Sequence, residues 1–79
     1  MPSGPQIRAA RALLGISAKD LAQLSGVGWA TIQRYEASIA VPNAQLEKMD
    51  QIAFALEQAG IEFLGDPLKS PGVRLKARK

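Results

Sequence analysis

The chain has 79 residues, a net charge of +3 and neither cysteine nor histidine, which excludes disulfides, thiolate chemistry, most zinc sites and every histidine-based catalytic dyad. A core of this size provides only a few kcal/mol of stability, so we expect one small domain that gains burial by self-association. Because the sequence has no apolar run long enough to span a membrane and no signal-peptide core, we expect no membrane association and a cytoplasmic location.

Two short helices are predicted at the start of the chain. Pro5 suits the first turn of a helix, and apolar residues at helical spacing follow it until a glycine, which predicts a helix over residues 5–14. Ser17 with Asp20 resembles a capping box, in which the acid also interacts favourably with the helix dipole. This box predicts a second helix over residues 17–24.

The residues that follow have the spacing of two helices that cross closely. Ala22 is small enough for the crossing point, and Gly26, four residues later, enters positive φ without steric cost. Ile32 and Tyr35 form the inward apolar stripe of a third helix over residues 29–37, which leaves its opposite face free for a groove. This spacing is typical of a DNA-binding helix-turn-helix.

The second half of the chain changes from helix to strand. Apolar residues at helical spacing predict the longest helix, over residues 43–59, which Gly60 ends. Residues 61–64 and 73–76 alternate apolar and polar side chains and predict two strands around a loop rich in proline and glycine. Because a two-stranded ribbon alone is marginal in water, it must pack on the helices or pair with another copy, and the sequence leaves both open.

A known family shares these features. The segments IRAARALLGIS and DLAQLSGVGWATIQRYE, together with Pro42, resemble the Cro and lambda-repressor (XRE-type) helix-turn-helix regulators over about residues 6–56. The resemblance implies a mainly α, lambda-repressor-like fold of four to five helices, whose third helix lies in the DNA major groove. Beyond the family's common core, a short C-terminal β-ribbon would complete a single helix-turn-helix domain over residues 1–79.

The resemblance also implies roles for particular residues. Arg11 and Glu36 match a structural ion pair that ties the first helix to the third. Trp29, Ala30, Gln33 and Arg34 match positions that read bases, where Gln33 suits adenine and Arg34 suits guanine, although an ordinary solvated helix face is the alternative. The implied phosphate contacts are Ser17, Lys19, Gly28 and Thr31, of which Thr31 is equally suited to packing.

Trp29 needs a cover, because an exposed indole lowers solubility. The indole could be covered by DNA, by the C-terminal ribbon or by a partner chain, and the sequence does not choose among them. Few phosphate contacts are expected beside it, since Ala18 and Ser38 stand where relatives often have glutamine and glycine. The basic end of the chain from Lys69 is either a solvated tail or a phosphate-binding arm.

The main hypothesis is a sequence-specific, non-enzymatic transcriptional regulator or repressor that binds double-stranded DNA without a cofactor or metal. A homodimer on a palindromic operator would double the phosphate contacts. The alternative is a protein-interaction module on the same scaffold, such as an antitoxin-like or anti-repressor partner, with Trp29, Ile39 and Val41 as its docking patch. The sequence does not identify the operator, the regulated genes or a small-molecule effector.

Overall fold

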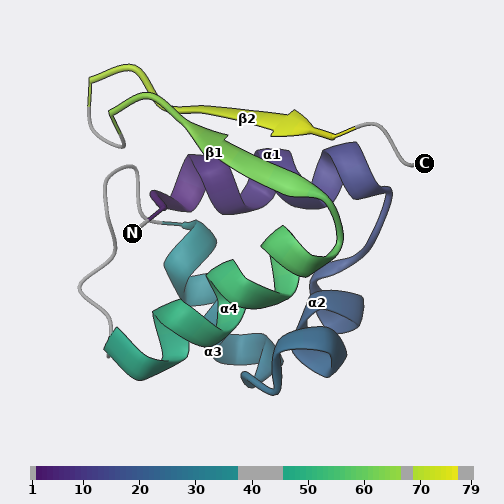
Figure 1. The fold of residues 1–79 in the computed structure, drawn as a ribbon. Coiled ribbons are helices and arrows are strands. Elements are labelled where there is room, and N and C mark those ends of the chain that lie inside the picture. The colour runs from purple at the N-terminus through teal and green to yellow at the C-terminus, as the bar shows by residue number, and fades with distance from the viewer. Residues whose placement is uncertain (1, 38–45, 67–68, 77–79) are drawn as a thin grey trace.

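The protein folds into helices followed by a β-hairpin (Figure 1). The computed structural model describes residues 2–37, 46–66 and 69–76. Within these ranges the elements are α1 (Gly4–Leu14), α2 (Ala18–Ser25), α3 (Trp29–Glu36), α4 (Leu46–Gln58), β1 (Ile61–Leu64) and β2 (Gly72–Leu75). None of the helices in the described ranges is long and apolar enough to cross a membrane. The expected mainly α fold with a short C-terminal ribbon is confirmed.

Several elements begin or end one residue away from the expected position, and capping explains the clearest case. Ser17, expected to be the first residue of a helix, is extended at φ −84° and ψ 168° and caps α2 from outside. Ala37 likewise follows α3 as its C-cap. The second strand begins at Gly72, because this residue pairs with the last residue of β1. Residues 43–45, expected to open the fourth helix, lie outside the described residues.

The core lies where the helices meet and extends to the hairpin. Ile7 of α1, Leu21 of α2, Ile32 of α3 and Ile52 of α4 are fully buried. Burying one such side chain stabilises the folded state by about 1.5–3 kcal/mol. Ile61 at the start of β1 belongs to the same cluster, so the hairpin shares its core with the helices.

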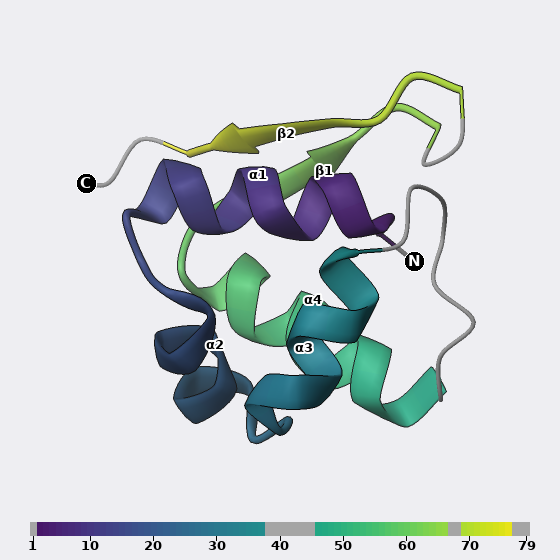
Figure 2. The ribbon, with the colours of Figure 1, turned by 180° about the vertical axis from the view of Figure 1, so that it is seen from behind.

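The hairpin covers the helices from one side (Figures 1 and 2). β2 packs along α1 and β1 packs on α4, whereas α2 and α3 lie on the side of α1 that faces away from the hairpin (Figure 1). Phe63 and Val73 face each other across the antiparallel pair and pack against the core. Of the two arrangements that the sequence left open, packing of the ribbon on its own helices is therefore present. The sheet and the helix-turn-helix lie on opposite sides of the domain.

Gln6 fastens the hairpin to the start of α1. Its Oε1 accepts a hydrogen bond from the backbone N–H of Ser3 at 2.8 Å, and the Ser3 hydroxyl caps the helix in return. The Nε2 of the same amide donates to the carbonyl oxygens of Leu64 at 3.2 Å and Gly72 at 3.0 Å. One buried side chain thus satisfies both a helix N-terminus and the end of the strand pair, a role that the sequence analysis did not assign to it.

Candidate nucleic-acid interface

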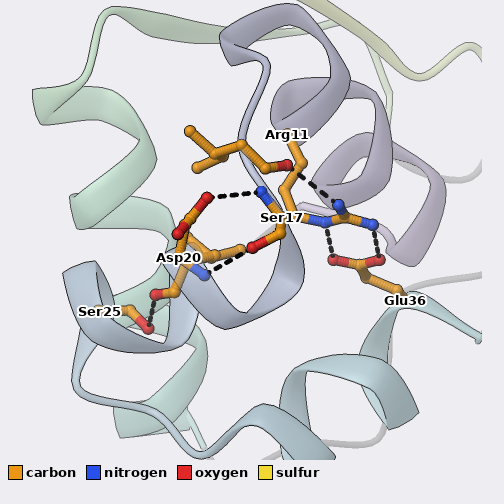
Figure 3. Close-up of polar contacts among 7 residues, drawn as sticks. Arg11, Ser17, Asp20, Ser25 and Glu36 are labelled. Carbon is orange, nitrogen blue, oxygen red and sulfur yellow. Dashed lines mark hydrogen bonds and ion pairs between the residues drawn. The ribbon is translucent and has the colours of Figure 1, made fainter.

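A capping box opens α2, the first helix of the helix-turn-helix (Figure 3). The Ser17 hydroxyl accepts from the backbone N–H of Asp20 at 3.0 Å, and the Asp20 carboxylate accepts from the backbone N–H of Ser17 at 3.0 Å. The bond from this backbone N–H, followed by the hydroxyl contact, lowers the pKa of Asp20 below its ordinary value.

The turn between α2 and α3 is held by backbone and hydroxyl bonds. Gly26 has φ +75°, and its N–H donates to the carbonyl oxygen of Ala22 at 3.0 Å. The Ser25 hydroxyl donates to the carbonyl of Leu21 at 2.7 Å and accepts from the N–H of Val27 at 3.2 Å. Gly26 therefore has the positive φ that its spacing predicts. The contribution of Ser25 was missed, because a serine at a helix end has no distinctive spacing.

An ion pair joins α1 to the end of α3 (Figure 3). Arg11 and Glu36 pair through two bonds, Nε to Oε2 at 2.7 Å and Nη2 to Oε1 at 2.8 Å. The Nη1 of Arg11 also donates to the carbonyl of Ile16 at 3.2 Å. Glu36 is only 6% exposed, and its hydrogen bonds raise the pKa of the Arg11 guanidinium. Because a buried carboxylate without a partner is costly, this pair stabilises the position of α3.

The outer face of α3 carries the residues that were expected to read bases. Trp29, Ala30, Gln33 and Arg34 are all exposed there. Trp29 remains 44% exposed, and the Nζ of Lys19 on α2 lies 5.5 Å from the centroid of its ring. This distance permits a cation–π contact. Lys19, which was expected to contact phosphate, therefore lies close to Trp29, which was expected to contact a base.

The other residues expected to contact phosphate lie at the starts of the two helices. Ser17 is the N-cap of α2, Lys19 lies in the first turn of that helix, and Gly28 is the N-cap of α3. Gly28 has no side chain that could cap the first N–H groups of α3. Such N–H groups attract anions. Thr31, within α3, is half-buried.

Arg8 is a further cation beside α3, and the sequence predicts it, with Lys19 and Arg34, as a group that can neutralise a phosphate. With Gln33, Glu36 and Ala37 it lines a surface hollow of about 230 Å³. Its side chain is exposed, and it forms no ion pair with any residue in the described ranges. Arg8 precedes Arg11 by three residues and therefore lies near the same face of α1.

In the part of the chain that the structure describes, no cluster of acidic side chains is suited to a metal ion.

Comparison with known families agrees with this geometry. A family model described as helix-turn-helix matches residues 7–56, a segment that reaches from α1 into α4 and contains the motif, the ion pair and the exposed face of α3. No curated protein matches the chain at a significant level. The match spans more than half of the 79 residues, and the chain therefore belongs to the helix-turn-helix family of the lambda-repressor and Cro type, whose members are DNA-binding regulators.

Proposed function

We propose that the protein is a sequence-specific transcriptional regulator that places α3 in the major groove of its operator. The observation that carries this proposal is the exposed outer face of α3, on a helix whose inner face is fixed by the core and by the ion pair. Gln33 offers an amide that can bind adenine through two hydrogen bonds, and Arg34 offers a guanidinium that can do the same with guanine. Trp29 is placed to pack on a thymine methyl group or a sugar.

A homodimer on a palindromic operator follows from the small number of phosphate contacts. The described cations near α3 are Arg8, Lys19 and Arg34, and affinity falls with salt in proportion to the phosphates that such groups neutralise. One subunit alone is therefore expected to bind weakly at physiological salt. Two copies related by a dyad double the contacts and read half-sites about one helical turn apart.

Regulation would follow from occupancy of the operator. A bound dimer can block or assist polymerase without any catalytic step, so the proposal includes no enzymatic activity and no cofactor. The proposed place of action is the cytoplasm.

Selection from a random duplex pool tests this function. The enriched duplexes should share an inverted repeat whose half-site centres lie about 10 base pairs apart or at a multiple of that spacing. Binding to the selected duplex should weaken linearly on a log–log plot against salt concentration. A folded protein that enriches no motif and binds no duplex even at low ionic strength would overturn the proposal.

A protein-interaction module on the same scaffold is the second candidate. Besides Trp29, the side chains of Leu24 and Phe54 are large, apolar and exposed, which suits a docking surface. Ile39 and Val41, the other members of the patch expected from the sequence, lie outside the described residues. Absence of duplex binding at low salt would favour this candidate over the first.

A further inference from the structure

Lys19 and Trp29 connect the two helices of the helix-turn-helix through a cation and an aromatic ring. Lys19 lies in the first turn of α2, and Trp29 is the first residue of α3. The Nζ of Lys19 lies over the indole, 5.5 Å from the centroid of the ring, which is within the range of a cation–π contact. A side chain of α2 therefore contacts the residue that opens the exposed face of α3.

The ammonium of Lys19 has the indole rather than a carboxylate as its partner. It forms no ion pair with any residue in the described ranges. Its acidic neighbour, Asp20, is committed to the start of its own helix, because the carboxylate accepts from the backbone N–H of Ser17 at 3.0 Å. The cation is therefore free to remain on the ring.

The backbone beneath both side chains is fixed by other contacts. The capping box of Ser17 and Asp20 sets the start of α2, and Ile32, which follows Trp29 by three residues, is fully buried. The freedom that remains lies in the side chains, since an exposed indole can turn about its own torsions. Ordering a mobile side chain when a partner binds costs free energy. A contact that already orders the indole lowers that cost.

We propose that Lys19 is a positioning residue, whose ammonium holds the indole of Trp29 in the orientation that meets a thymine methyl group of the operator. This role rests on the function proposed above, in which α3 enters the major groove. Trp29 is 44% exposed with the ammonium in place, so apolar surface is left for the methyl group. Lys19 thereby contributes to base preference without touching a base.

The chemistry of the base edges explains why such a ring selects thymine. In the major groove, thymine alone presents a C5-methyl group, whereas the other bases present only hydrogen-bonding groups there. The face of an indole offers apolar contact, and its single N–H lies at the ring edge. A ring held in one orientation therefore favours the base that has a methyl group.

The positioning role can be separated from a phosphate contact by the same amine. An ammonium has three N–H donors, so a contact with the ring leaves others for water or phosphate. Loss of a phosphate contact weakens binding to every duplex alike. Loss of the held ring weakens binding only to duplexes that have the methyl group. The ratio of the two affinities, rather than either affinity, is the quantity that Lys19 should control.

The first test measures the motion of the ring without DNA. Trp29 is the only tryptophan, so time-resolved fluorescence anisotropy reports on its indole alone. Lys19→Gln should enlarge the amplitude of ring rotation on the nanosecond or faster timescale. Lys19→Arg should restore the wild-type amplitude, because a guanidinium also stacks on aromatic rings. Lys69→Gln, which removes the same charge from the exposed turn of the hairpin, is the matched control and should move like the wild type.

The second test replaces the thymines of the selected duplex by uracil, one at a time. Uracil lacks only the methyl group, and at the contacted position the wild type should bind thymine about fourfold more tightly, as expected for one buried methyl group. Trp29→Ala should abolish this preference and so identify the position. Lys19→Gln should bring the ratio close to one, whereas Lys19→Arg and Lys69→Gln should keep the wild-type ratio.

Equal ring motion in the wild type and Lys19→Gln would overturn the proposal. A thymine preference that Lys19→Gln leaves unchanged, or the absence of any preference that depends on Trp29, would overturn it as well. The first test needs no DNA. A protein whose ring motion responds as expected but which binds no duplex would therefore count against the proposed function, whereas a duplex bound with an unchanged ratio would count against the role of Lys19 alone.

Discussion

The two faces of α3 differ in what holds their side chains. On the inner face, Ile32 and Tyr35 are buried in the core, and Glu36 is held by two bonds from Arg11. On the outer face, Gln33 is exposed and Trp29 is approached by the amine of Lys19. The inner face therefore depends on this chain, whereas the outer face is open to another molecule. Substitutions on the two faces should separate stability from binding.

Arg11→Ala should cause the largest loss of stability. It leaves the buried carboxylate of Glu36 without its partner, so the free energy of unfolding should fall by about 3–5 kcal/mol in a urea titration. Arg74→Ala, which breaks the exposed pair with Glu62, is the control and should cost about 0–1 kcal/mol. If Arg11→Ala melts like the wild type while duplex binding disappears, Arg11 belongs to the binding face.

Gln33→Ala and Arg34→Ala should show the reverse pattern. Each is expected to weaken binding to the selected duplex by about 1–3 kcal/mol and to relax the preference at one base pair. Because both side chains are exposed, the free energy of unfolding should change by less than about 0.5 kcal/mol. Gln58→Ala, at an exposed position of α4, should change neither quantity. A melting temperature that falls together with affinity would mean that the outer face also supports the fold.

Gly26→Ala should cost about 1–2 kcal/mol of stability through the backbone alone. An added Cβ would have no atom within 4 Å, but φ is +75°, a conformation that residues with a side chain rarely adopt. Gly28→Ser is the control, because Gly28 has φ −61° and also has space, and serine is a good N-cap. Its stability should change by less than about 0.5 kcal/mol. Equal melting temperatures for both variants would contradict the role of positive φ in this turn.

Asp20→Asn should have the smallest effect, and the effect should depend on pH. The pKa of Asp20 is lowered in the folded state by the N–H of Ser17, so the charged form adds stability above the unfolded pKa. This contribution is lost as pH falls through the lowered pKa. The variant should therefore melt below the wild type at neutral pH, and the two melting temperatures should converge in strong acid. A constant difference across that range would point to a cause other than the charge.

The comparison also explains what the sequence could predict. Gly26 and the capping box have requirements that a few neighbouring residues meet, so spacing alone identified them. Gln6 was missed because its partners are carbonyl groups of strands 58 and 66 residues away. Gln33 remains a proposal for a different reason: a residue that binds another molecule leaves no mark in the packing of its own chain.

The amide of Gln6 has a consequence for the order in which the domain is completed. It lies in α1, which is synthesised before α4, yet its two acceptors belong to the hairpin that follows α4. While the hairpin is still inside the ribosome, α1 has neither these bonds nor the strand that covers it. Hydrogen exchange on stalled nascent chains should therefore show α1 fraying until β2 emerges, so that α1 becomes protected late although it is synthesised before α4.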